Sequence, residues 1–166
     1  MNVTSQPART AAVALLVISV GALGLAFTLD RAFDVLPCRL CIFQRLVYLT
    51  TVSFAIVAFA GSAYPRIVSW ACLLSAAAFV VGAGIALHHV GVEHHWWGSL
   101  GSCGGELAGE ISLTNLRERL QNTSGVACDE VMWRLFGFSL AEMNAASSPL
   151  LALAASIVGV RLRRLG

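Results

Sequence analysis

The chain has 166 residues, of which 57% are hydrophobic and 12% are charged, and its formal net charge is +2. A soluble domain carries about 25% charged residues, so the composition favours a membrane-embedded protein over a globular one. The strongly basic residues are all arginine, and so small a net charge argues against nucleic-acid binding.

Four apolar stretches predict transmembrane helices. Each approaches the ~20 residues that cross a bilayer, and in lipid a helix satisfies all the backbone hydrogen bonds of one segment. The predicted spans cover residues 11–29, 42–61, 67–87 and 145–160, the last being the shortest. The first is longer than the apolar region of a signal peptide, and we expect it to be retained. The sequence therefore predicts one all-α domain over residues 1–166, a four-helix transmembrane bundle.

The distribution of charges predicts the orientation of this bundle. All nine acidic residues fall in the connections 30–41 and 88–144. Because arginine is enriched on the cytoplasmic side of span ends, we expect both termini and the turn at 61–66 to be cytoplasmic and the two longer connections to lie outside. The arginines that carry this argument are Arg9, Arg66, Arg161, Arg163 and Arg164.

The stretch PCRLCIFQR, at 37–45, joins a thiol pair to a positive charge at the start of the second span. Pro37 suits a helix entry, which places Cys38 and Cys41 in the first turn, where the helix dipole favours thiolate. Arg45 follows Cys41 by four residues and lies on the same helix face. Its guanidinium would stabilise a Cys41 thiolate and donate to an oxygen-bearing ligand. The alternative is that Arg45 only extends towards the lipid headgroups.

Two more cysteines, Cys103 and Cys128, fall in the second external loop, whereas Cys72 lies within the third span. Four external cysteines allow three pairings, of which Cys38–Cys41 with Cys103–Cys128 is the simplest. We expect Cys72 to be a small buried hydrophobic residue.

A zinc site is an alternative use of these cysteines, together with the four histidines at 88–95. Structural zinc takes four ligands, and the second half of this set lacks the short spacings typical of zinc motifs. We therefore expect no metal.

The end of the long loop, 129–143, reads DEVMWRLFGFSLAEM, with apolar side chains at helical spacing. This pattern predicts a short amphipathic helix on the outer membrane surface. Such a helix would hold Cys128 near the bilayer, within reach of Cys38.

His88 and His89 end the third span at the expected depth of Cys41 and Arg45. They could offer imidazole groups to a ligand there, or they could be polar residues of the interface without a specific role.

The order of these features resembles the bacterial DsbB family of quinone-dependent, disulfide-generating membrane proteins. PCRLCIFQR is the strongest element, CDEVMWRLFGFSLAEM looks like the family segment after the last loop cysteine, and ALHHVGVEHHWW is similar to an alphaproteobacterial subset. The vitamin K epoxide reductase relatives place their CxxC after the loop cysteines, and the order here argues against them.

The resemblance implies a thiol oxidase of the bacterial inner membrane, with its catalytic cysteines in the periplasm. A DsbA-type periplasmic thiol oxidase would attack Cys103 of a Cys103–Cys128 bridge, and Cys128 would then attack Cys38. Cys41 would leave as a thiolate beside Arg45 and pass electrons to ubiquinone or menaquinone. His88 or His89 would lie near the quinone.

Two other functions remain open from the sequence. The paired histidines could bind haem in a four-span electron carrier. The protein could also be a structural four-span membrane protein with non-catalytic disulfides.

Overall fold

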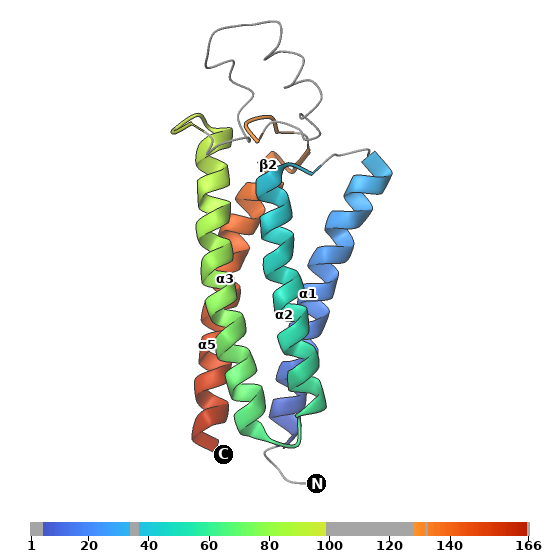
Figure 1. Cartoon of the computed structure of the whole chain (residues 1–166), viewed down its shortest axis with the longest axis vertical. Helices are drawn as coiled ribbons and strands as arrows, with labels where there is room; N and C mark the ends of the chain where they lie inside the picture. The colour runs from blue at the N-terminus through green and yellow to red at the C-terminus, as the bar shows by residue number, and fades with distance from the viewer. Residues whose placement is uncertain (1–4, 34–36, 99–127, 132, 166) are drawn as a thin grey trace, which may run out of the picture.

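The computed structural model describes residues 5–33, 37–98, 128–131 and 133–165, and all structural statements below concern these residues. Four long helices run side by side along the long axis of the molecule (Figure 1). They are α1 (Ser5–Phe33), α2 (Arg39–Ala60), α3 (Pro65–Glu93) and α5 (Leu140–Leu165). The start of α1, the α2–α3 turn and the end of α5 lie at one end of the bundle, and the thiol pair lies at the other (Figure 1).

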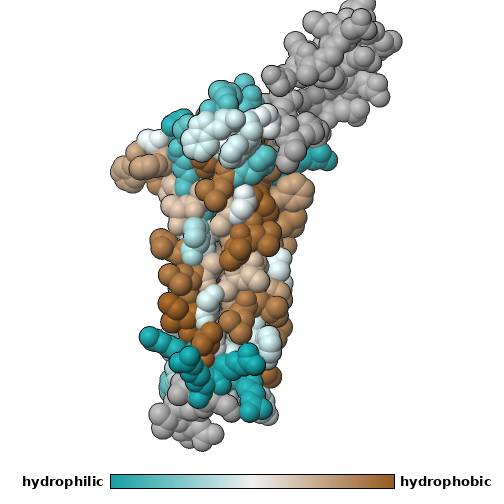
Figure 2. All heavy atoms as spheres, turned by 90° about the vertical axis from the view of Figure 1, so that its left-hand side faces the viewer, coloured by the Kyte–Doolittle hydropathy of each residue, from teal (hydrophilic) through white to brown (hydrophobic). Residues whose placement is uncertain are grey.

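Each helix is long and apolar enough to cross a bilayer. A band of hydrophobic side chains covers the middle of the face formed by α3 and α5, and hydrophilic side chains gather at both ends of the bundle (Figure 2). This surface is the one that a lipid environment requires, and it confirms an all-α membrane bundle. Three helices, α1, α3 and α5, extend beyond the predicted apolar segments at both ends, and α5 reaches 26 residues. α2 begins before the predicted span and ends at Ala60, one residue before its predicted end.

Small residues bring α3 and α5 close together. The Ser69 hydroxyl donates to the Gly159 carbonyl oxygen over 2.7 Å, and a Cβ added at Gly159 would lie 2.9 Å from Leu73 Cγ. Close approach at small residues is how membrane helices gain packing and interhelical hydrogen bonds. Cys72 packs in the same core with 1% of its surface exposed, which confirms its prediction as a buried small residue.

The predicted amphipathic helix at 129–143 is wrong over the described residues 134–139. A hairpin forms there instead, with β1 (Arg134–Leu135) paired antiparallel to β2 (Phe138–Ser139). Its turn places Phe136 at φ 52° and Gly137 at φ 89°, and positive φ at two successive residues is incompatible with an α-helix and typical of a tight hairpin.

The end of the same segment belongs to α5, which begins at Leu140. The Ser139 hydroxyl oxygen accepts from the Glu142 N–H over 3.1 Å, and the Ser139 N–H donates to Glu142 Oε2 over 2.7 Å. This reciprocal pair is a capping box, which fixes the helix start. The fourth helix therefore begins ahead of the predicted span. Residues 99–127 and 132 of the long loop lie outside the described residues.

Candidate functional site

The thiol pair lies where α2 begins. Cys38 is the N-cap, with extended backbone, and its Sγ accepts from the Cys41 N–H over 3.2 Å. Cys38 was predicted to lie in the first helical turn; it is instead the N-cap, directly after Pro37, and Cys41 lies in the first turn. The thiol of Cys38 donates to Cys41 Sγ over 3.0 Å. This hydrogen bond and burial raise the pKa of Cys38 to about 12, so Cys38 stays protonated and directs its proton at Cys41.

Cys128 is brought to the same place. It is 1% exposed and forms a buried cluster with Cys38 and Val92, against which Cys41 packs. The sequence placed Cys128 near Cys38 by means of a surface helix; the structure does so with the turn at 128–130 that precedes the hairpin. Cys103 lies outside the described residues.

Arg45 forms an ion pair with Asp30 of α1. Its Nη1 donates to Asp30 Oδ2 over 2.5 Å and its Nη2 to Asp30 Oδ1 over 2.7 Å, and its guanidinium lies 5.3 Å from the Phe27 ring centroid. Sequence reasoning missed Asp30, whose only signal was an acidic residue next to the end of an apolar span.

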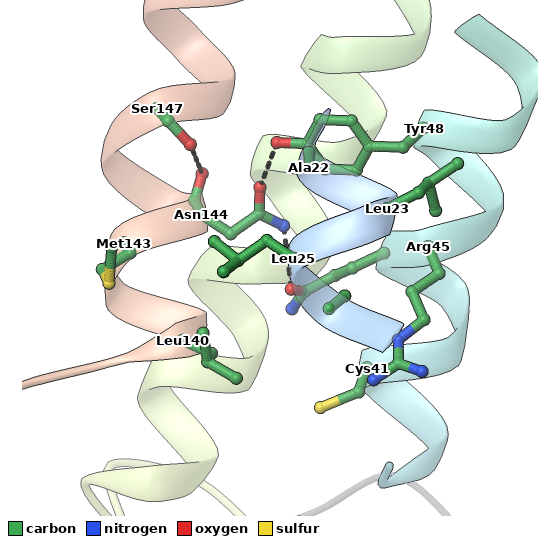
Figure 3. A pocket seen from close by; sticks show the side chains of 12 residues that line it. Ala22, Leu23, Leu25, Cys41, Arg45, Tyr48, Leu140, Met143, Asn144 and Ser147 are labelled. Atoms are coloured by element: carbon green, nitrogen blue, oxygen red, sulfur yellow. Dashed lines mark hydrogen bonds between the residues drawn. The ribbon is translucent and has the colours of Figure 1, made fainter. Parts of the chain in front are cut away.

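A cavity of about 240 Å³ lies between α1, α2 and α5. Its walls are mostly apolar, with a few polar groups, the composition typical of small-molecule sites. Cys41 and Arg45 lie towards one end of it, and Tyr48, Asn144 and Ser147 lie further along the bundle (Figure 3). Cys41 therefore contacts Cys38 and also lines the cavity.

The structure separates the two candidate histidines. His89 is 4% exposed, with Nε2 3.5 Å from Cys38 Sγ and Nδ1 3.1 Å from Gln44 Nε2. The His88 ring instead stacks on Trp97, with ring centroids 5.9 Å apart. Neither histidine is among the residues that line the cavity, and the two rings have different surroundings.

Three potential metal ligands also meet at this site. The donor atoms of Cys38, Cys41 and His89 lie within 4.8 Å of one another. The zinc set considered from the sequence contained these three residues together with Cys103, Cys128 and the other three histidines. His89 lies 51 residues from Cys38, so no short spacing singled it out.

Thiols buried at the end of a transmembrane bundle, one of them bordering a cavity, define a membrane-embedded thiol protein. Comparison with known proteins identifies its family, because the model of disulfide bond formation protein DsbB matches residues 8–158. The chain is also similar to disulfide bond formation protein B of Psychrobacter sp. (strain PRwf-1), with 32% identity over 111 residues, 64% of this chain and 64% of that protein's length. No solved structure matches the chain. The chain belongs to the DsbB family of disulfide bond formation proteins.

The surroundings of the two thiols predict unequal reactivity. In the reduced protein we expect N-ethylmaleimide to alkylate Cys41 at least tenfold faster than Cys38. Cys38 is 5% exposed, and its hydrogen bond to Cys41 together with burial raises the pKa of its thiol, so little of it is present as the reactive thiolate. Timed alkylation followed by peptide mass spectrometry measures both rates, and the buried Cys72 provides an internal reference. Faster labelling of Cys38 would contradict the assignment of its proton.

Proposed function

We propose that the protein is a protein-disulfide:quinone oxidoreductase, which reoxidises a periplasmic thioredoxin-like thiol oxidase of the DsbA type. The observation that carries this proposal is the position of Cys41. Its Sγ lies 3.0 Å from Cys38 Sγ, and the same residue lines the cavity with Arg45. When disulfide exchange takes place at Cys38, the electron pair would therefore pass to Cys41 and from there to a ligand in the cavity.

The exchange steps follow from the reactivity of thiolates. The partner's thiolate attacks Cys103 of a Cys103–Cys128 disulfide, which breaks that bond, forms a partner–Cys103 mixed disulfide and releases Cys128 as a thiolate. The partner's second thiolate then resolves the mixed disulfide, which leaves the partner oxidised and releases Cys103 as a thiolate. Cys128 attacks Cys38 of a Cys38–Cys41 disulfide, and Cys41 leaves with the electron pair. Cys103 then attacks Cys128 of the Cys38–Cys128 disulfide, which restores the Cys103–Cys128 disulfide and releases Cys38 as a thiolate. The burial of Cys128 with Cys38 supports this second step. Over one cycle the partner loses two electrons and two protons.

The cavity residues fit a quinone as the acceptor. The apolar walls suit a lipid-soluble ring, and Arg45 and Asn144 offer hydrogen-bond donors to carbonyl oxygens. When bound, ubiquinone or menaquinone would accept two electrons and two protons. Such an acceptor is needed because a DsbA-type partner has a potential near −120 mV, too high for an ordinary thiol pair to oxidise.

The proposed orientation places both termini in the cytoplasm and the thiols in the periplasm of a bacterial inner membrane. Its support is the arginines at the end of the bundle opposite Cys38. Arg9 lies over the Phe59 ring and Arg163 over the Trp70 ring, 5.8 and 5.3 Å from the ring centroids. Arginines at one end of the spans favour the cytoplasmic side.

The proposal predicts quinone-dependent thiol oxidation by the purified protein in lipid vesicles. With a reduced DsbA-type partner and a soluble ubiquinone or menaquinone analogue, we expect one partner disulfide for each quinone reduced. Partner thiols and quinone absorbance are measured in parallel, with protein-free vesicles as the control. Partner oxidation that proceeds without quinone consumption would contradict the proposed electron path.

A further inference from the structure

A line of hydrogen bonds crosses the bundle from α5 through α2 to α3. The donor and the acceptor in each bond can be deduced by starting at Asn144, its end on α5. The hydroxyls of Tyr48 and Ser148 both lie against Asn144 Oδ1, at 2.8 and 2.9 Å. An amide oxygen only accepts, so this atom takes both hydroxyl protons. If the Asn144 amide were turned by 180°, its nitrogen would face the two hydroxyl groups. Both hydroxyl groups would then have to accept from the amide, and neither could donate its own proton to it. Figure 3 shows the Tyr48–Asn144 bond.

The orientation of Asn144 sets that of Gln44. Asn144 Nδ2 donates to Gln44 Oε1 over 2.8 Å, which leaves Gln44 Nε2 to face His89 Nδ1 at 3.1 Å. An amide nitrogen only donates, so Nδ1 must accept and carries no proton. The neutral ring therefore holds its proton on Nε2.

This ring proton lies beside the thiol pair. His89 Nε2 is 3.5 Å from Cys38 Sγ and 3.7 Å from Glu93 Oε1, and the His89 and Glu93 side chains are 5% and 7% exposed. In a dry site of this kind, a hydrogen bond to a charged sulfur is worth more than one in water.

We infer that Gln44 and Asn144 are positioning residues, which hold the His89 proton on Nε2 so that the ring donates to the Cys38 sulfur. The inference rests on the proposed function in one respect, since it makes Cys38 a sulfur that carries negative charge during exchange. Gln44 and Asn144 act through His89, and Asn144 does so from a helix that supplies none of the thiols.

The same arrangement bears on metal binding. The donor atoms of Cys38, Cys41 and His89 are close enough to share a thiophilic cation when the thiols are reduced. A metal needs the lone pair of Nε2, which the proton occupies. A carboxylate in place of either amide would reverse the hydrogen bonds and draw the proton to Nδ1, as in carboxylate–histidine–zinc sites. The two amides thus keep the reduced site from capturing metal.

Nuclear magnetic resonance of ¹⁵N-histidine in the reduced full chain tests the tautomer. The four histidines give few signals, and His89→Gln assigns the one of interest. We expect a protonated Nε2 and an unprotonated Nδ1 in the wild type. Gln44→Glu and, independently, Asn144→Asp should each place a proton on Nδ1. The control Thr50→Ala, which removes a hydroxyl that bonds the Leu46 carbonyl on the exposed side of α2, should leave the signal unchanged.

Asn144→Asp is the sharper variant because the hydrogen-bonded line joins residue 144 to His89 through Gln44, so a change in packing alone would not move a proton between ring nitrogens. It also keeps the test available if a buried glutamate at position 44 prevents folding. A wild-type Nδ1 that carries a proton, or an unchanged tautomer in both variants, would overturn the inference.

Metal affinity is the second readout. We expect the reduced Asn144→Asp protein to bind Zn²⁺ about 10- to 100-fold more tightly than the wild type, the usual effect of groups that orient a metal-bound histidine. Competition with Co²⁺, followed by its thiolate charge-transfer absorption, measures the ratio, and equal affinities would contradict the role assigned to the amides. Neither readout requires turnover, so loss of quinone-dependent activity and failure of this inference are separate results.

Discussion

Replacement of Cys41 by serine is expected to reduce quinone-dependent oxidation of the partner to the level of protein-free vesicles. Thiolates, and not hydroxyls, exchange with disulfides, and Cys41 is the residue that borders both Cys38 and the cavity. Serine at this position leaves the cavity and Arg45 in place but removes the sulfur through which electrons would leave. Partner thiol titration with and without quinone measures the effect.

The matched control is Cys72→Ala. Cys72 is 1% exposed within the hydrophobic core of α3 and away from the thiol pair, so activity should stay near the wild-type rate with a modest loss of stability. Cys103→Ser should be as inactive as Cys41→Ser because it removes the sulfur that, in the proposed mechanism, the partner would attack. Wild-type turnover in Cys41→Ser would show that electrons leave by another route.

The helices could be predicted from hydropathy because lipid constrains each span separately. Their ends could not, since they depend on polar contacts that hydropathy does not report. α3 continues through His88 and His89 to Glu93, and α5 starts where Ser139 and Glu142 cap each other. The apolar spacing at 129–143 suggested a helix because spacing alone does not report backbone conformation. The positive φ at Gly137 belongs to a turn that no α-helix can contain.

At the site, sequence reasoning found the groups that a local motif brings together. Cys38, Cys41 and Arg45 lie within nine residues. It did not find Asp30 or Asn144, which lie 15 residues from Arg45 and 100 residues from Gln44. No spacing rule connects such pairs, because only helix packing brings them into contact. The contact with Asp30 changes the role expected for Arg45, because both terminal nitrogens of its guanidinium already bind the Asp30 carboxylate.

Replacement of Arg45 by methionine is expected to raise the apparent KM for the quinone by roughly 30-fold. A hydrogen bond to a charged group contributes about 2 kcal/mol, and each 1.4 kcal/mol is a tenfold change in affinity. The variant should also be less stable, because the Asp30 carboxylate, whose side chain is 17% exposed, would lose its partner in a largely apolar setting. Steady-state kinetics and thermal unfolding of the detergent-solubilised protein measure the two effects.

The double variant Asp30→Asn/Arg45→Met separates the two roles of the arginine. Removing both charges abolishes the uncompensated carboxylate, so stability should recover towards that of the wild type. The KM should remain raised, because the donor that faces the cavity is still missing. If the KM instead returned to the wild-type value, Arg45 would act only by joining α2 to α1 through Asp30. A raised KM in a stable double variant would place the wild-type guanidinium in contact with the quinone, through N–H groups that the two bonds to Asp30 leave free.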